Sequence, residues 1–420
     1  MNVTVSSSNP HGKIKAIASK SIAHRILICA AFADKPTRIR CEEINNDIKA
    51  TVSCLSSLGA DICYEYPYFQ VSPIKSLQKD AILDCGESGS TLRFLIPIVT
   101  ALGANAFFDM HGRLPERPLS PLKEELEAHG ALLSYRDTNR LYCEGQLSGL
   151  EYSIAANVSS QFISGILFAL AIWGKGGTLK LTGKIESAPY IDMTTDTLKL
   201  FGVNISFSDS MFTVLPADKL ISPKDVNVEG DWSGAAFPIC MGVLGQSAVE
   251  VFGLNLSSRQ GDREILNILR RFGADIVENG DSVIAKGNAM LHGINIDASQ
   301  IPDLVPVMAT VAATAKGTTV ISGAERLRIK ESDRLSAVKE MLNTLGANIT
   351  ETKDGLIING VPHLCGGIVS SYNDHRIAMS AAVASAVCQR DVTITDAEAT
   401  SKSYPQFWND IEDLSVIVKK

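Results

Sequence analysis

Basic and hydroxyl side chains gather in short runs, several of them rich in glycine or serine, that open segments with helical hydrophobic spacing. The runs are Ser19–Arg25, Gly86–Arg93, Val158–Gln161, Arg328–Arg334 and Asp374–Arg376. The N-terminus of a helix attracts anions through its exposed N–H groups and dipole, and Lys and Arg side chains add charge-assisted hydrogen bonds. Because a basic residue opposes the dipole at that end, these runs indicate a site for phosphate or carboxylate groups.

Each run also has a purely structural interpretation. Serine before a helix is a common N-cap, and Lys330, Glu331 and Arg334 could form a surface salt-bridge ladder. Lys330 and Arg334 are expected to share a helix face, with Glu331 one residue off it. Three further charged residues lie before apolar helices or in loops: Arg117, Asp303 and Lys402. A lone charge of this kind is often only a cap, but recurrence at matched places of a repeat favours the anion site.

A sequence repeat has to position these residues. Five helix-like segments end in a glycine that is followed by the start of an apolar strand, at a spacing of roughly 72 residues, and in four of them a leucine or phenylalanine precedes the glycine. The glycines are Gly59, Gly130, Gly202, Gly273 and Gly346. Glycine just past a helix end tolerates the positive φ of a C-terminal cap. The pattern therefore predicts an α/β protein built as an α+β repeat of parallel and antiparallel strands with helices.

The chain length fits nearly six such units. A last helix at Pro405–Leu414 is followed by one strand, and Met1–Val5 alternates like a strand, so the N-terminus is expected to complete the sixth unit. Six units exceed a single core, which predicts two domains of three units each. The expected bounds are residues 1–19 with 228–420 for one domain, 20–227 for the other, and 18–20 and 227–231 for the hinges.

Composition narrows the class of protein. The net charge of −7, without a basic tail, disfavours nucleic-acid and membrane-surface partners. Nine scattered cysteines indicate reduced thiols in a cytoplasmic protein, and the histidine spacing gives little support to a metal site. The N-terminus lacks a signal-peptide core, and the longest apolar stretch, Phe162–Trp173, is too short to span a bilayer.

In these runs the sequence resembles the enolpyruvyl transferase family, over a stretch from Lys13 to Trp408. The matching motifs are Ser19-Lys-Ser-x-x-x-Arg25, Gly86-x-Ser-Gly89-x-x-x-Arg93, Glu116-Arg-Pro118, Ser159-Ser-Gln161, Ser187-x-Pro-Tyr190-Ile-Asp-Met-Thr194, Val228-Glu-Gly-Asp231, Ile301-Pro-Asp303, Arg328-x-Lys-Glu-Ser-Asp-Arg334, Asp374-His-Arg376 and Thr400-Ser-Lys402. The resemblance implies two domains of three units, with the active site in the cleft between them.

The resemblance also implies a reaction. The enolpyruvyl group of phosphoenolpyruvate passes to the 5-hydroxyl of shikimate 3-phosphate, and phosphate leaves, by addition and elimination through a tetrahedral intermediate. This is the transferase step of the shikimate pathway that leads to chorismate and the aromatic amino acids. No metal and no organic cofactor is implied, and we expect a cytoplasmic monomer whose partners are the two small substrates, with neither nucleic acid nor membrane.

Matching motif positions carry the implied roles. The implied catalytic residues are Lys20, Asp303 and Glu331. Those implied to bind shikimate 3-phosphate are Lys20, Ser21, Arg25, Ser159, Ser160, Gln161, Ser187, Asp303 and Lys330. Those implied to bind phosphoenolpyruvate are Lys20, Gly89, Arg117, Gln161, Arg334, Arg376 and Lys402.

Three positions depart from the common pattern. Glu87 stands where the family usually has Asn, and Ser90 where Thr is usual, both in the turn expected to hold phosphoenolpyruvate. A carboxylate near an anion should weaken its binding unless Glu87 points away. Arg326 replaces a frequent Asn beside the substrate and is left out of the expected site.

Two alternative functions remain open. The sister transferase acting on UDP-N-acetylglucosamine shares the fold and the donor, but it usually carries a cysteine in the loop that corresponds to residues 112–118, where this chain has none. A non-enzymatic, ring-like nucleic-acid clamp could also be built from six units. Such a clamp should expose a basic inner surface, whereas here the basic residues gather at helix starts with acids among them.

Overall fold

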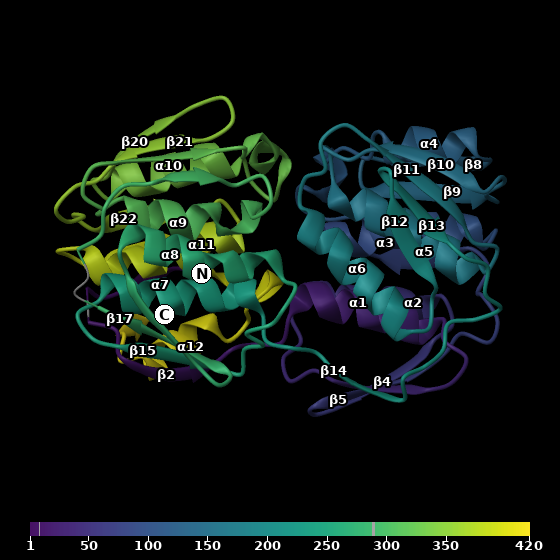
Figure 1. Ribbon diagram of the computed structural model, residues 1–420, viewed down its shortest axis with the longest axis horizontal. Helices are drawn as coiled ribbons and strands as arrows, with labels where there is room; N and C mark the ends of the chain where they lie inside the picture. Colours follow the sequence, from purple (N-terminus) through teal and green to yellow (C-terminus); the bar gives the residue numbers. More distant parts are fainter. Residues whose placement is uncertain (8, 288–289) are drawn as a thin grey trace. The chain divides into compact units, whose positions relative to one another are not determined.

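The structure, a computed structural model, describes the chain except for residues 8 and 288–289. The chain folds into two compact units, each made of helices and small sheets (Figure 1). Unit 1 comprises Met1–Ser19 and Glu229–Lys420, and unit 2 comprises Lys20–Val228. The chain therefore passes from one unit to the other twice, directly after Ser19 and directly after Val228.

Unit 2 contains, within the described residues, three four-stranded sheets. In hydrogen-bonded order these are β14 (Asp225–Asn227), β3 (Thr37–Arg40), β5 (Tyr68–Ser72) and β4 (Asp61–Glu65); β6 (Ala81–Asp84), β7 (Ala106–Asp109), β9 (Arg140–Gly145) and β8 (Ala131–Asp137); and β10 (Glu151–Ala155), β11 (Gly177–Thr182), β13 (Met211–Val214) and β12 (Ile205–Ser208). The helices are α1 (Lys20–Ala31), α2 (Asn46–Ser57), α3 (Gly89–Ala101), η1 (Leu114–Glu116), α4 (Leu122–Ala128), α5 (Ser160–Trp173) and α6 (Ala188–Leu200).

Unit 1 repeats this arrangement in its described part. Its three sheets are β16 (Asp275–Asn279), β17 (Ser282–Lys286), β15 (Val249–Phe252) and β2 (Gly12–Lys15); β18 (Asn295–Asp297), β19 (Thr318–Ser322), β21 (Leu356–Asn359) and β20 (Asn348–Glu351); and β22 (Gly367–Ser370), β23 (Val392–Thr395), β1 (Val3–Val5) and β24 (Val418–Lys419). The helices are α7 (Trp232–Leu244), η2 (Gly261–Glu264), α8 (Ile265–Phe272), η3 (Pro302–Leu304), α9 (Val305–Ala312), η4 (Glu325–Ile329), α10 (Arg334–Thr344), α11 (His375–Ala384), η5 (Ser385–Val387), η6 (Ala397–Lys402) and α12 (Phe407–Asp413).

All six sheets have the same design. In each, the two strands at one edge pair in parallel and the other two pairings are antiparallel, as in β6–β7–β9–β8 and, from the opposite edge, in β2–β15–β17–β16. A parallel pair needs a long crossover, which here contains a helix, whereas the antiparallel pairs can use hairpins. The predicted mixed α/β repeat of six units is therefore confirmed. The five glycines that mark the repeat have φ between 78° and 114°, as C-terminal caps require.

Strands from the chain ends, and strands next to the two crossings between the units, complete sheets whose other strands lie far away in the sequence. Strand β1 pairs antiparallel with both β23 and β24, so the N-terminus does complete the last unit. Strand β2 pairs in parallel with β15 of unit 1, whereas β14 pairs in parallel with β3 of unit 2. Val228, which the expected division assigned to the other domain, follows β14 and donates its N–H to the carbonyl oxygen of Arg40 at 2.9 Å.

One predicted helix begins later than expected. The run Arg328–Arg334 becomes α-helical only at Arg334, because the side chain of Asp333 caps α10 by accepting from the N–H of Ser336 at 3.2 Å. Lys330 lies before this cap, in extended backbone. The prediction that Lys330 shares a helix face with Arg334 is therefore wrong.

A close packing of two helices positions part of the site. Helices α3 and α5 pack together (Figure 1), and a Cβ added at Gly165 of α5 would overlap the carbonyl oxygen of Arg93 in α3. The absence of a side chain at Gly165 thus lets the two helices approach each other. No helix in the described part of the chain is both long and apolar enough to cross a membrane.

We predict that Gly165→Ala destabilises the protein. The added methyl group has no room against backbone, so the two helices must move apart, at a cost of about 2 kcal/mol in the free energy of unfolding. Denaturant unfolding followed by circular dichroism measures this. Lys199→Ala, on the exposed side of α6, is the control and should change stability by less than about 0.5 kcal/mol. Equal stabilities for the two variants would contradict the packing argument.

Candidate active site

Lys20 is the first residue of α1 and forms an ion pair with a residue that was not among the predicted site residues. Its Nζ atom donates to Oδ2 of Asp47 on α2 at 2.8 Å, and the two side chains are only 16% and 15% exposed. A partly buried ion pair of this kind fixes the ammonium group at the start of the helix. Asp47 follows two asparagines and reads in the sequence as an ordinary first-turn acid, so only the fold indicates its role.

Arg25 is a buried cation whose partners are neutral. Its guanidinium donates to the carbonyl oxygens of Ser21 and Tyr190 at 2.6 and 2.8 Å and to Oγ1 of Thr194 at 2.9 Å. It also lies 5.2 Å from the ring centroid of Phe94. No carboxylate among the described residues pairs with it. Burial lowers the pKa of Arg25 to about 10, so the group stays charged and favours an anion.

The start of α3 brings two arginines against the backbone. A Cβ added at Gly89 would lie 2.6 Å from Nη1 of Arg93 and 3.0 Å from Nη1 of Arg117. Arg93 also donates to Oε1 of Gln161 on α5 at 2.9 Å, and Nε2 of Gln161 donates to Oγ of Ser90 at 3.0 Å. The missing side chain at Gly89 therefore leaves room for both guanidinium groups at a helix N-terminus, the arrangement that suits a phosphate or carboxylate.

Glu87, the unusual residue of this turn, packs against the neighbouring loop. A Cβ added at Gly112 would lie 2.5 Å from Oε2 of Glu87. Gly112 has φ of 54°, so a side chain there would also be strained. The Glu87 carboxylate thus lies against Gly112, at the start of the loop that carries Arg117.

The expected serines lie at two further helix starts. Ser159 caps α5 by accepting from the N–H of Gln161 at 3.3 Å, and Ser160 is buried beside it. Ser187, before α6, is buried in the left-handed conformation with φ of 53°. A left-handed non-glycine residue costs about 1 kcal/mol and is common at functional sites. Capping accounts for Ser159, whereas capping does not account for the strained Ser187.

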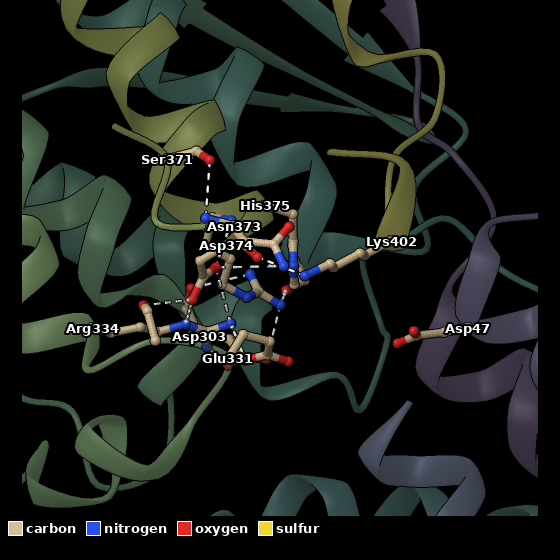
Figure 2. Close-up of polar contacts among 12 residues, drawn as sticks. Asp47, Asp303, Glu331, Arg334, Ser371, Asn373, Asp374, His375 and Lys402 are labelled. Atoms are coloured by element: carbon tan, nitrogen blue, oxygen red, sulfur yellow. Dashed lines mark hydrogen bonds and ion pairs between the residues drawn. The ribbon is translucent and has the colours of Figure 1, made fainter. Parts of the chain in front are cut away.

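Unit 1 contains a cluster of charges around one buried arginine. Arg334 is 1% exposed and opens α10. Its guanidinium donates to Asp374 Oδ2 at 2.8 Å, to Asp303 Oδ1 at 2.9 Å and to Glu331 Oε2 at 2.7 Å. Figure 2 shows these carboxylates gathered about Arg334. Three acids neutralise one cation, so the cluster needs further positive charge.

A second arginine supplies that charge. Arg376, in the first turn of α11, donates to Oδ2 of Asp303 at 2.8 Å and to its carbonyl oxygen at 3.1 Å. Asp303, in η3, therefore bridges Arg334 and Arg376. Oδ1 of Asp374, the N-cap of α11, accepts from the N–H of Arg376 at 2.9 Å and so connects both arginines to the same helix start.

The bridging carboxylate has a shifted pKa. Burial acts to raise the pKa of Asp303, yet neighbouring cations outweigh burial and hold the pKa below its ordinary value. These cations are Arg376, Lys330 and Arg334. Burial likewise acts to lower the pKa of Arg334, but its three acids outweigh that effect and raise it. Asp303 and Arg334 are therefore both ionised near neutral pH.

Two lysines of the expected site lie outside helix N-termini. Lys402 ends η6, where its Nζ donates to the carbonyl oxygen of Asn373 at 2.6 Å beside the start of α11 (Figure 2). Lys330 follows η4 and is half-buried. The salt-bridge alternative does hold for Arg328, which pairs with Asp333 and with Glu351. Arg334 is instead buried and belongs to the cluster of acids.

The structure thus brings the expected residues together in two groups. In unit 2 these are Lys20, Ser21 and Arg25 on α1, and Gly89, Arg117 and Gln161 around α3 and α5, with Ser159, Ser160 and Ser187 at neighbouring helix starts. In unit 1 they are Asp303, Lys330, Glu331, Arg334, Arg376 and Lys402. No group of three or more His, Cys, Asp or Glu side chains in the described residues could hold a metal ion.

Comparisons with known proteins agree on one family. A family model described as EPSP synthase (3-phosphoshikimate 1-carboxyvinyltransferase) matches residues 6–411. A 3-phosphoshikimate 1-carboxyvinyltransferase of Clostridium perfringens strain SM101 is 42% identical, with 100% of this chain and 99% of that protein covered. The protein of the same name from Clostridium beijerinckii is 41% identical, with 96% and 95% covered.

Solved structures agree on the fold. The EPSP synthase from Acinetobacter baumannii has a TM-score of 0.82 at 24% identity, with 100% of both chains covered. The enolpyruvyl transferase NikO from Streptomyces tendae has a TM-score of 0.79 at 18% identity, with 100% of this chain and 98% of that one covered.

We predict that Arg334→Leu is strongly destabilising. The change leaves the buried Asp374 and the partly buried Asp303 and Glu331 without their shared cation, a loss of about 3–5 kcal/mol in the free energy of unfolding. Because Arg334 helps hold the pKa of Asp303 below its ordinary 3.8, ionised Asp303 stabilises the fold above that pH, and this contribution is lost as the pH falls. The stability gap between wild type and variant should therefore narrow towards about pH 3.

Chemical denaturation at several pH values measures this gap. Arg390→Leu, at an exposed position, is the matched control and should leave stability nearly unchanged at every pH. A gap for Arg334→Leu that is small, or that widens in acid, would contradict the charge-pairing account.

Proposed function

This chain belongs to the EPSP synthase family, and we propose that it transfers the enolpyruvyl group of phosphoenolpyruvate to the 5-hydroxyl of shikimate 3-phosphate, with release of phosphate. This makes it an enzyme of the shikimate pathway and aromatic amino acid biosynthesis. The relatives favour neither the transferase acting on UDP-N-acetylglucosamine nor a nucleic-acid clamp. We further propose that it works in the cytoplasm as a monomer.

The site chemistry supports this function. The two substrates carry two phosphates and two carboxylates, which several cations must neutralise at once. The observation that carries the proposal is Asp303, a carboxylate only 17% exposed that binds two buried arginines, Arg334 and Arg376. In this arrangement a substrate anion can take up the arginines' charge while the carboxylate stays beside it.

We assign the substrates to groups of residues. Shikimate 3-phosphate is held by Lys20, Ser21, Arg25, Ser159, Ser160, Gln161, Ser187, Asp303 and Lys330. Phosphoenolpyruvate is held by Lys20, Gly89, Arg117, Gln161, Arg334, Arg376 and Lys402. Both sets draw on the two units, so in this proposal the substrates bind in a cleft between them and bridge the units. Binding then neutralises like charges that would otherwise repel.

Proton transfer follows from the same charges. Addition joins the 5-oxygen to C2 of phosphoenolpyruvate, removes the hydroxyl proton and adds a proton to C3; elimination removes a C3 proton and breaks the bond to phosphate. In the ligand-free cluster the arginines keep Asp303 a weak base. A phosphoenolpyruvate anion at Arg334 and Arg376 offsets their charge, which raises the pKa of Asp303 towards the range of a general base. Glu331 and Lys20 are the other proton-transfer groups of this proposal.

The direct test is activity. The purified chain should release phosphate on mixing with phosphoenolpyruvate and shikimate 3-phosphate, and should form the enolpyruvyl ether, detectable by mass spectrometry. Phosphoenolpyruvate with UDP-N-acetylglucosamine is the comparison reaction. Turnover of the second pair but not the first would reject the proposed acceptor.

Carboxamide variants separate chemistry from binding. Asp303→Asn and Glu331→Gln keep shape, so substrate KM values should stay within a small factor while kcat falls about 100-fold or more. Asp413→Asn, an exposed acid on α12, is the control and should keep full activity. Near-normal kcat with a large rise in KM for both variants would mean that these acids only orient the cations.

A further inference from the structure

Arg376 has a contact that the family resemblance did not supply. Besides Asp303, its guanidinium donates to Oγ of Ser233 at 2.6 Å. Ser233 lies in the first turn of α7, whose N-cap is Asp231. Helix α7 packs against both η2 and η3, so Ser233 lies on the helix that connects the segment of Asp303 with a second acidic segment.

The second acid is Asp262 in η2. It is buried, at 3% exposure, and the side chain of Ser233 acts to lower the pKa of its carboxylate, so the two side chains interact. A guanidinium has only donors, so Ser233 accepts from Arg376 with an oxygen lone pair. The hydroxyl hydrogen of Ser233 is then available to donate to the carboxylate of Asp262. Donation thus runs in one direction along the series, from Arg376 to Ser233 and from Ser233 to Asp262.

The turn that carries Asp262 is firmly anchored. Gln260, directly before η2, is buried, and its Oε1 accepts from Oγ of Ser19 at 3.1 Å and from the N–H of Trp232 at 3.2 Å. Its Nε2 donates to Glu229 Oε1 and to the carbonyl oxygen of Gly230, both at 2.8 Å. A side chain with four such bonds, two of them to residues where the chain enters and leaves unit 1, fixes the backbone around Asp262.

The environment of Asp262 admits both of its protonation states. Burial raises the pKa of Asp262 to about 7, and Asp303 and Asp231 add to that rise while Arg376 opposes it. Either form keeps an oxygen that accepts from Ser233. An asparagine at this position would offer the same acceptor without charge.

We propose that Ser233 and Asp262 position Arg376 for the phosphoenolpyruvate anion: Asp262 fixes the hydroxyl rotor of Ser233, and Ser233 fixes one edge of the guanidinium. Asp303 fixes the neighbouring N–H groups, so the guanidinium is held from two sides. Both new residues act through Arg376 and are positioning residues. The inference rests on the proposed function, in which Arg376 binds phosphoenolpyruvate.

Steady-state kinetics test the first step. Ser233→Ala removes an acceptor from Arg376 and should raise KM for phosphoenolpyruvate about tenfold, with KM for shikimate 3-phosphate and Tm nearly unchanged. Ser233→Thr keeps the hydroxyl and should restore a KM near that of wild type. An unchanged KM for phosphoenolpyruvate in Ser233→Ala would overturn the proposal.

A double-mutant cycle tests the second step. If Asp262 acts through Ser233, Asp262→Ala should raise the same KM, Asp262→Asn should stay near wild type, and the double variant Ser233→Ala/Asp262→Ala should be no worse than Ser233→Ala alone. Fully additive losses would overturn the relay. Glu264→Gln, an exposed acid of the same turn, is the matched control and should behave as wild type.

Two further results have a defined meaning. Should Asp262→Ala fail to fold, the comparison of Ser233→Ala with Ser233→Thr decides the proposal, and equal KM values for those two variants reject it. A wild-type protein that releases no phosphate rejects the proposed function itself, whereas an active wild type with unaffected variants rejects only the positioning role.

Discussion

The bridge that Asp303 makes between Arg334 and Arg376 is the interaction on which the rest of the site depends. Two buried guanidinium groups would repel each other and lose their hydration without a carboxylate between them. Asp374 and Glu331 complete the neutralisation of Arg334; Asp374 is the N-cap of α11, and Glu331 lies two residues before the N-cap of α10. In the proposed mechanism a substrate anion competes with these acids, so substrate binding and proton transfer would depend on the same few charges.

The repeat explains why such residues meet. In each unit a helix follows one strand of the parallel pair. The N-terminus of that helix offers free N–H groups and the positive end of the helix dipole. In unit 2 the starts of α1, α3 and α5 carry Lys20, Gly89 and Ser160. The starts of α10 and α11 in unit 1 carry Arg334 and, one residue into the helix, Arg376. Repetition of one fold unit thus places a helix N-terminus with a polar or basic residue, or a glycine, at each of these proposed anion sites.

Some of this could be predicted from the sequence, because local rules decide it. Gly59 and its four equivalents have the positive φ that glycine caps require, and the last helix, expected at Pro405–Leu414, spans Phe407–Asp413. The prediction that Lys330 and Arg334 share a helix face was wrong, because the N-cap at Asp333 makes α10 begin only at Arg334. Asp47, Ser233 and Asp262 have no local signal, because their roles arise from partners that are far away in the sequence.

The most direct test of the central claim is the pKa of Asp303 with and without ligand. Carboxyl-carbon NMR of ¹³C-labelled aspartate, assigned with Asp303→Asn, follows this one group. The account predicts a pKa below the ordinary 3.8 in the ligand-free protein. Shikimate 3-phosphate together with a non-reactive phosphonate analogue of phosphoenolpyruvate should raise that pKa clearly. The same pKa in both states, with binding shown independently, would contradict the claim that the substrate anion takes over the charge of the two arginines.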